Sequence, residues 1–242
     1  MIMARTFSLT FAFALLLSRP ASSQESIDAA QPTVNFETIK NGVYGRITVR
    51  GDVPQLAPLL KERDIYGGQL HIEKNIPDES LIVGNDGGLA NVFIYLRRKP
   101  DDIQFVPNHR SKTLESIGGR FAPHAQVIQT GQPLIIRNRD PSAHNVNFHP
   151  FINFIKSDVV NPPKRGDKFP EKTISLQVPE PIPILVTDDF YAWKRAYVLP
   201  LDHPFAAVTN IHGQFHIAGL PPGTYEFVCG TKKSDILTAN SR

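Results

Sequence analysis

The side chains that could carry chemistry are concentrated in the second half of the chain. It contains His144, then the run Asp188–Tyr197, then His203. Imidazole and carboxylate groups suit zinc or copper(II). His144, His203 and Asp188 are therefore a candidate metal site, provided that the fold brings them together. The aromatic residues of the run, Tyr191 and Trp193, are candidates for stacking on a ligand.

Two kinds of hydrolase are excluded by the local patterns. Ser142 lies two residues before His144, but its context favours a turn and lacks the nucleophile elbow of a serine hydrolase. Asp188 and Asp189 could be the paired carboxylates of a glycosidase. Adjacent residues of a strand point to opposite faces, so these two acids cannot act together. We therefore predict that the protein is not an enzyme.

A series of short motifs occurs in the order found in one known family. The motifs are Ile76-Pro77-Asp78-Glu79-Ser80-Leu81, Gly87-Gly88-Leu89-Ala90-Asn91-Val92, Phe121-x-Pro123-His124, Gly131-Gln132, Asn138-x-Asp140, His144-Asn145-Val146 and Leu201-Asp202-His203-Pro204. Together they resemble secreted, cupredoxin-like bacterial proteins of the methylamine-utilization-protein-like family. The resemblance extends from Ile76 to Phe227.

The resemblance implies a copper site that this chain has lost. In the family a loop supplies a cysteine, a histidine and a methionine at intervals of three residues, and an earlier strand supplies a second histidine. With Trp193 as anchor, the loop positions fall on Asp188, Tyr191 and Lys194, and only His144 is kept as a ligand type. A blue-copper site requires the thiolate. The expectation is a degraded site with no bound cofactor, and copper is implied by the resemblance alone.

The replacement of two soft ligands by Asp188 and Lys194 suggests what fills the pocket. We expect the two charges to neutralise each other, with carboxylate and ammonium within ~4 Å. The alternative is a rearranged loop in which both side chains point to solvent.

Alternating apolar residues predict strands throughout the chain. Strands are expected over the ranges Val43–Val49, Asn91–Leu96, Leu134–Asn138, Thr173–Val178, Ile182–Val186 and Thr224–Val228, and as a hairpin of Phe205–Thr209 and Gln214–Ala218 around Asn210–Gly213. Only Leu56–Ile65 has leucines spaced for a short helix. With 21 prolines, the chain is predicted to be all-β, an antiparallel β-sandwich of cupredoxin-like type with Greek-key connections.

The N-terminus predicts export. A basic start, the apolar run Phe11–Leu17 and Ala21-Ser22-Ser23 indicate a signal peptide over 1–23, cleaved near Ser23. A periplasmic or secreted location follows; a buried N-terminal helix is the alternative. The apolar run is shorter than the ~20 residues of a transmembrane helix. Cleavage removes Arg5 and Arg19, which lowers the net charge of +3 by two, to +1. Nucleic acid is therefore not an expected partner.

The remaining boundaries follow from composition. Residues 24–40 are a polar segment, 41–228 the cupredoxin-like β-sandwich, and 229–242 a polar tail whose loss of the family pattern suggests an open sheet edge. Cys229 is the single cysteine, so no intramolecular disulfide can form.

The leading interpretation is an exported, non-enzymatic, cupredoxin-like module that binds a partner or has a structural role. One alternative is a copper-binding electron-transfer protein, as the resemblance implies. Another is a carbohydrate-binding module, because the final hairpin is similar to that of carboxypeptidase-regulatory-like and carbohydrate-binding-like sandwiches. The expected partners are carbohydrate or protein of the periplasm or cell envelope; the sequence does not identify the ligand.

Overall fold

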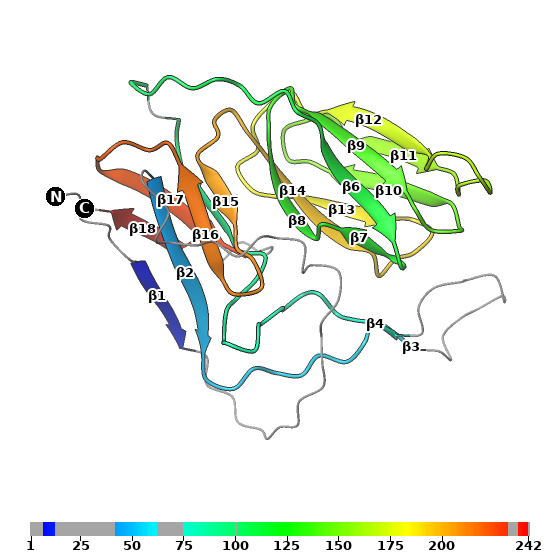
Figure 1. Cartoon of the computed structure of the whole chain (residues 1–242), viewed down its shortest axis with the longest axis horizontal. Helices are drawn as coiled ribbons and strands as arrows, with labels where there is room; N and C mark the ends of the chain where they lie inside the picture. The colour runs from blue at the N-terminus through cyan, green and yellow to red at the C-terminus, as the bar shows by residue number, and fades with distance from the viewer. Residues whose placement is uncertain (1–6, 13–41, 62–74, 100, 232–236, 242) are drawn as a thin grey trace. The chain divides into compact units, whose positions relative to one another are not determined.

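The computed structural model describes residues 7–12, 42–61, 75–99, 101–231 and 237–241. Within these ranges every regular element is a β-strand (Figure 1), as the sequence predicted. The described residues contain no helix long and apolar enough to cross a bilayer. The short helix considered for Leu56–Ile65 is not formed in its described part, because Leu60–Lys61 are strand β3.

The chain folds as two compact units where the sequence predicted one sandwich over 41–228. Unit 1 contains residues 1–55, 80–102 and 205–242, and unit 2 contains 56–79 and 103–204. Each unit has two main sheets, and unit 2 carries the candidate site.

Unit 2 is a β-sandwich. Its five-stranded sheet has the order β11 (Lys156–Val160), β10 (His144–His149), β13 (Ile184–Asp188), β14 (Arg195–Leu201), β8 (Ala125–Gln129). Its four-stranded sheet has the order β12 (Glu171–Ser175), β9 (Pro133–Asn138), β6 (Lys112–Ile117), β7 (Arg120–Ala122), and β3 pairs separately with β4 (Asn75–Ile76). The chain crosses from β11 to β12 in the other sheet and returns at β13, which matches the predicted Greek-key type of connection.

Most strand pairs of the sandwich are antiparallel, but two are not. β14 pairs with β8 in parallel, and β6 pairs with β9 in parallel. The antiparallel sandwich expected from the sequence is therefore confirmed, with two parallel pairs that the sequence did not predict. A parallel neighbour cannot be joined by a short turn, which is why the local turn signals of the sequence did not reveal these pairs.

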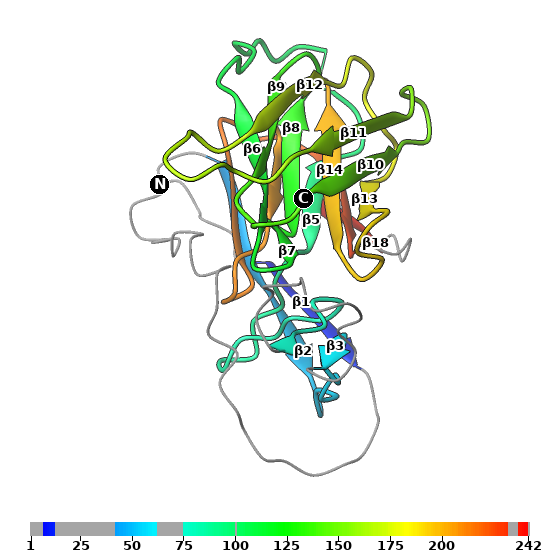
Figure 2. The same cartoon turned by 90° about the vertical axis from the view of Figure 1, so that its right-hand side faces the viewer.

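The core of unit 2 lies between its two sheets, which face each other in Figure 2. Apolar side chains from nine strands fill it: Leu114, Phe121, Ile128, Leu134, Ile136, Val146, Phe148, Val160, Ile174, Leu176, Ile184, Val186, Ala196 and Val198, with Leu176 lying just beyond β12. The alternation in β12 stops there. The predicted strand Thr173–Val178 would place Val178 on the inward face with Ile174 and Leu176, but Val178 is exposed.

Unit 1 also has two sheets. One has the order β1 (Phe7–Ala12), β2 (Gly42–Arg50), β16 (Gln214–Ala218), and the other has the order β15 (Ala206–Val208), β5 (Phe93–Leu96), β17 (Tyr225–Gly230), β18 (Leu237–Ser241). The predicted hairpin of β15 and β16 forms only its turn, where Gly213 N–H donates to Asn210 O and φ of Gly213 is +70°. Beyond the turn, β15 pairs with β5 and β16 with β2.

Both ends of the chain differ from the boundaries predicted for them. β17 extends to Gly230, and β18 pairs with it in antiparallel register. The predicted open edge after Phe227 is therefore covered by residues assigned to a polar tail. At the N-terminus, β1 pairs in parallel with β2. The rest of the predicted signal peptide and polar segment, residues 1–6 and 13–41, lies outside the described residues, so export stays a prediction.

In unit 1, two turns cross so closely that their backbone atoms are in contact, and a glycine in each turn makes this possible. A Cβ on Gly88 would lie 2.1 Å from the carbonyl carbon of His212, and a Cβ on Gly213 would lie 2.0 Å from Ile47 O. The backbone hydrogen bonds Ile47 N–H to Gly213 O and Leu89 N–H to Ile47 O hold this crossing together. There is no room for a side chain at either glycine.

The crossing predicts the effect of one methyl group. Gly88→Ala should lower the free energy of unfolding by about 3 kcal/mol or more, because backbone atoms must move to admit the Cβ. The matched control is Gly223→Ala, whose Cβ would meet only the movable ring end of Tyr225 and should cost about 0.5 kcal/mol or less. Urea unfolding curves of the two variants measure the difference; equal stabilities would contradict the close approach.

Candidate functional site: a buried charge cluster

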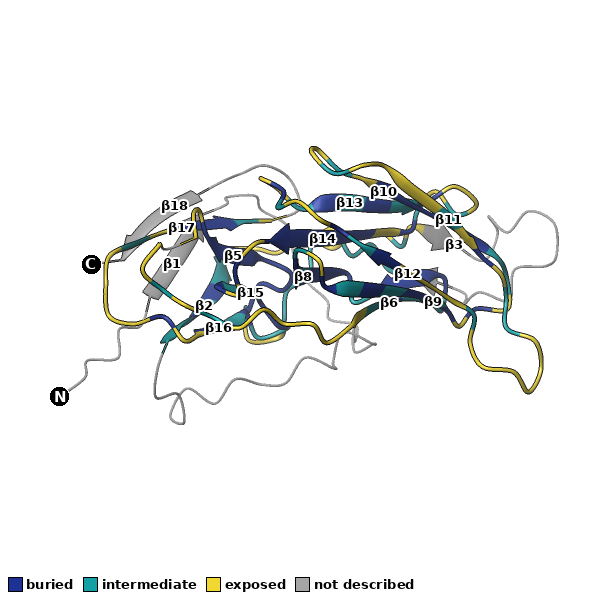
Figure 3. Ribbon diagram, turned by 90° about the horizontal axis from the view of Figure 1, so that it is seen from above, coloured by how far each residue is buried: buried dark blue, intermediate teal, exposed yellow. Residues whose placement is uncertain are grey.

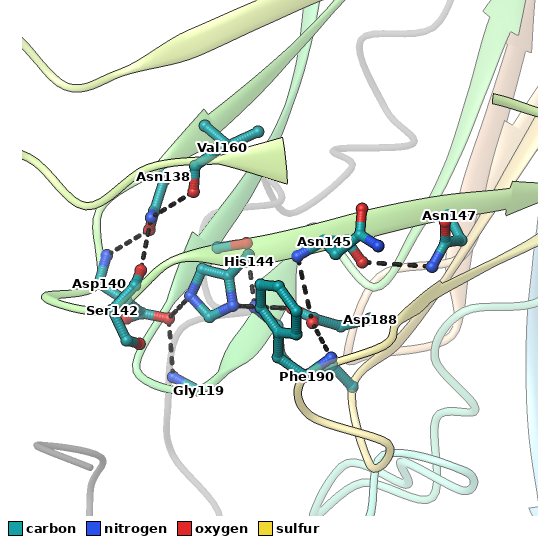
Figure 4. Close-up of polar contacts among 12 residues, drawn as sticks. Gly119, Asn138, Asp140, Ser142, His144, Asn145, Asn147, Val160, Asp188 and Phe190 are labelled. Atoms are coloured by element: carbon teal, nitrogen blue, oxygen red, sulfur yellow. Dashed lines mark hydrogen bonds and ion pairs between the residues drawn. The ribbon is translucent and has the colours of Figure 1, made fainter. Parts of the chain in front are cut away.

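The site is built around the imidazole of His144, which is fully buried between two carboxylates (Figure 4). Nδ1 lies 2.7 Å from Asp188 Oδ2, and Nε2 lies 3.0 Å from Asp140 Oδ2. His144 begins β10 and Asp188 ends β13, and the antiparallel register pairs Val146 with Asp188. Strand pairing therefore places these two side chains at the same end of the sheet.

Lys194 adds a cation to the same point. Its Nζ lies 3.3 Å from Asp188 Oδ2 and 2.9 Å from His144 Nδ1, and it donates to Ser116 Oγ at 2.9 Å. The ammonium also lies 4.4 Å from the ring centroid of Phe121, a cation–π contact. Ser116 and Phe121 belong to β6 and β7, so this one side chain links the two sheets of unit 2.

The expected ion pair between Asp188 and Lys194 is thus confirmed. Both side chains have no exposed surface, and their separation is within the ~4 Å of an ion pair. The alternative, in which the loop rearranges and both side chains point to solvent, is wrong.

Backbone donors fix the two carboxylates. Asp188 Oδ1 accepts from the N–H of Phe190 at 2.9 Å and of Asn145 at 3.4 Å, and Asp140 Oδ2 accepts from the N–H of Gly119 at 3.3 Å. Each carboxylate therefore bonds to a loop as well as to the histidine. The cluster is held by the backbone on several sides.

A second buried side chain positions Asp140. Asn138 Oδ1 accepts from the N–H of Asp140, while its Nδ2 donates to three carbonyl oxygens, those of Ser142, Val160 and Asn161 (Figure 4). The amide thus joins the end of β9 to β11 and to the turn before His144. This is the role of the Asn138-x-Asp140 motif in the structure.

Both carboxylates of the cluster are held in the ionised form. Burial alone would raise the pKa of Asp140 and Asp188, but the hydrogen bonds from His144 and the charge of Lys194 outweigh it and hold both pKa values below their usual range. The imidazole of His144 lies between the two carboxylates, with one ring nitrogen at hydrogen-bond distance from each.

Burial has the opposite consequence for the lysine. It lowers the pKa of Lys194 to about 8, although the charges of Asp188 and Asp140 act to raise it. Near neutral pH the ammonium is the main form, and it becomes a neutral amine in mildly alkaline solution. His144 Nδ1 and the ammonium of Lys194 both contact Asp188 Oδ2, and they lie 2.9 Å from each other. As a neutral amine, Lys194 could instead accept a hydrogen bond from Nδ1.

The structure brings together four of the residues singled out in the sequence. The Tyr191 ring centroid lies 5.0 Å from that of His144, so all four positions that the family resemblance assigns to metal ligands meet here. Trp193 packs on Tyr191 at 5.4 Å and donates from Nε1 to Gly119 O. These contacts use part of the aromatic surface considered for ligand stacking, which stays a prediction.

Other candidate residues lie apart from the cluster. His203 is buried, and among the described residues no group of three histidine, cysteine or acidic side chains could hold a metal. His203 therefore does not complete a ligand set with His144 and Asp188. Asp189 accepts from Asn145 Nδ2 on an exposed surface, away from the buried Asp188. The two acids do point apart, as predicted.

The sequence interpretation missed the roles of Asp140, Ser116 and Phe121. Asp140 lies four residues before His144, a spacing that could have suggested a partner. Ser116 and Phe121 carry no local signal, because only the packing of the second sheet brings them to Lys194.

The donor set does not fit the copper that the resemblance implies. The two carboxylates occupy opposite nitrogens of His144, so their lone pairs do not converge on one point. An ammonium lies 2.9 Å from Nδ1, where it repels a cation. The only cysteine, Cys229, is buried in β17 of unit 1, where burial raises the pKa of its thiol to about 11. It therefore stays protonated at neutral pH.

Comparisons with known proteins find weak structural similarity. No protein-family model matches the chain, and no curated protein matches it. Similar solved structures are amicyanin of Paracoccus versutus (16% identity, 45% of this chain, 97% of that chain, TM-score 0.32) and an oxidised amicyanin mutant (11%, 37%, 80%, 0.31). A copper-containing nitrite reductase of Thermus scotoductus SA-01 is similar over 45% of this chain and 25% of its own length (12%, TM-score 0.30). At these identities and TM-scores the similarity is distant.

The buried ion pair predicts a large effect of removing its cation. Lys194→Met should lower the free energy of unfolding by about 3–5 kcal/mol, because it leaves the buried carboxylate of Asp188 without its cation. Arg195→Met, at the neighbouring exposed position, is the control and should change stability by about 0.5 kcal/mol or less. Chemical denaturation at pH 7 measures both; a Lys194→Met protein as stable as the parent would rule out a stabilising role of the ion pair.

The lowered pKa of Lys194 predicts a gain of stability in alkali. Between its folded value of about 8 and the ordinary 10.5, the unfolded chain binds more protons than the folded one. The free energy of unfolding should therefore rise with pH, by up to about 1.4 kcal/mol per unit. Denaturation curves of the parent and of Lys194→Met are measured at pH 7, 8, 9 and 10. The difference between their free energies of unfolding removes the contribution of the other titrating groups and should rise with pH. A flat or falling difference would contradict it.

Proposed function

We propose that the protein is an exported, non-enzymatic β-sandwich module that acts through its surface, as a binding or structural component. In this proposal the pocket that holds copper in cupredoxins is closed by the cluster of Asp140, His144, Asp188 and Lys194. The cluster maintains the sandwich and has no redox role.

The observation that carries the proposal is the bonding of Asp188 and Lys194 to each other and to His144. The three groups lie within 2.7–3.3 Å of one another without exposed surface. Both oxygens of Asp188 and Oδ2 of Asp140 have protein donors. This internal bonding supports a structural role for the cluster.

The donor chemistry weighs against the electron-transfer alternative. A blue-copper centre depends on a covalent copper–thiolate bond, and the position that the resemblance assigns to the sulfur holds a carboxylate. The position assigned to the weak axial ligand holds an ammonium. Both replacements favour an internal ion pair over a soft metal.

Rebuilding the donor set tests the proposal. The variant Asp188→Cys/Tyr191→His/Lys194→Met should acquire the intense visible absorption of a copper–thiolate bond when copper(II) is added, whereas the parent protein should stay without it. Absorption spectra and calorimetric titration with copper(II) measure the two outcomes, and circular dichroism checks that the variant folds.

The matched control is Asp188→Ser/Tyr191→His/Lys194→Met, which lacks only the sulfur and should show no such absorption. Copper–thiolate absorption in the parent protein would overturn the proposal in favour of an electron carrier. A folded cysteine variant that binds copper without this absorption would show that Asp188 is not the cysteine position.

A further inference from the structure

Unit 2 carries a group of large apolar side chains that lie in solvent. The loop between β10 and β11 exposes Phe151, Ile152, Phe154 and Ile155, with Phe151 at 78% and Phe154 at 88% (Figure 3). The segment between β12 and β13 adds Val178 at 41% and Ile182 at 39%. We call these two segments, 150–155 and 177–183, the apolar tip.

A buried carboxylate holds the first segment in place. Glu180 is 3% exposed, and its oxygens accept from the backbone N–H groups of Phe151, Ile152 and Asn153 at 2.7–3.0 Å. Burial alone would raise the pKa of Glu180, but the hydrogen bonds from Asn153, Ile152 and Phe151 lower it. The carboxylate is therefore ionised and fully used inside the tip.

The side chain of Asn153 joins the two segments. Its Oδ1 accepts from the N–H of Gln177 and Val178, and its Nδ2 donates to Val178 O and to Glu180. The apolar side chains therefore stand on two loops that are bonded to each other, and their exposure belongs to a defined structure.

The bonding pattern meets part of the demands of an apolar medium. Within lipid, a backbone N–H without a partner costs several kcal/mol. In the tip, the N–H groups from Phe151 to Asn153 and of Gln177, Val178 and Glu180 have protein acceptors, and four prolines have no N–H to satisfy. The N–H groups of Phe154, Ile155 and Ile182 have no acceptor among the described residues, so the backbone of the tip is satisfied in part.

One cation lies next to the tip. Glu180, the only charged residue of the two segments, is buried and internally bonded. The exposed residues that bracket the first segment are His149 and Lys156, and the half-buried Asp158 lies two residues beyond Lys156. Apolar side chains can enter the acyl boundary of a lipid surface, and a cation next to them can bind the phosphates of anionic lipids.

We propose that the apolar tip inserts into the interface of an anionic lipid bilayer, with Phe151 and Phe154 entering the acyl region and Lys156 lying at the phosphates. The proposal gives the exported module described above a partner, and it rests on the proposal that the protein is exported. It does not depend on whether the protein binds copper, because the tip contains no residue of the charge cluster. Vesicle binding and copper binding can therefore fail independently.

Co-sedimentation with vesicles tests the inference. The purified protein is mixed with vesicles of phosphatidylethanolamine and phosphatidylglycerol at 3:1, and with vesicles of phosphatidylcholine alone. It should bind the anionic vesicles, more weakly at high salt, and bind phosphatidylcholine several-fold less. Phe151→Ser/Phe154→Ser should reduce the partition coefficient at least tenfold, and Phe154→Ser alone should give an intermediate loss.

The control is Phe190→Ser, which removes an exposed phenylalanine that lies outside the tip and should leave binding within twofold of the parent. Thermal unfolding checks that all variants are folded. No binding of the parent to anionic vesicles, or equal binding by the double variant, would overturn the proposal. A third outcome would also overturn it: the parent forms a dimer in sedimentation velocity, the double variant does not, and neither binds vesicles. The tip would then contact a second copy of the chain.

Discussion

The mutual bonding of the buried charge cluster is the constraint on which the end of the unit 2 sandwich depends. Two carboxylates, an imidazole and an ammonium are removed from water there, and each is tolerated only because the others are present. Asp188 Oδ2 is the shared acceptor, 2.7 Å from the histidine and 3.3 Å from the lysine. Loss of one member leaves the others without a buried partner, so the four positions are expected to change together or not at all.

The same constraint gives the loop between β13 and β14 its shape. Asp188 Oδ1 accepts from Phe190 N–H at the start of the loop, and Lys194 N–H donates to Tyr191 O at its end. With the lysine side chain reaching Ser116 in the opposite sheet, the loop folds inward. The loop is in this way held closed by an ion pair.

Sequence reasoning succeeded where local periodicity decides the structure. β2 and β5 lie where alternation predicted them, and all of β5 is buried, as expected for a strand apolar on both faces. The ion pair of Asp188 and Lys194 was also predicted, from opposite charges six residues apart, with a solvent-facing loop as the alternative. Both results depend on residues close together in the sequence.

Prediction failed where distant residues decide. The inward position expected for Val178 was wrong because Asn153, 25 residues away, bonds its N–H and carbonyl and turns the segment outward. The hairpin of β15 and β16 was predicted from its turn, but the strands separate because each finds a partner far along the chain. The pairing of β18 with β17 was missed since a polar composition does not exclude backbone pairing.

The position of the sole tryptophan has a practical consequence. Trp193 donates to Gly119 O, contacts Tyr191, and precedes the lysine of the cluster. Its intrinsic fluorescence therefore arises beside the charges that hold the loop. Unlike a global probe such as circular dichroism, this optical signal reports local opening of one end of one unit, and it does so without a label.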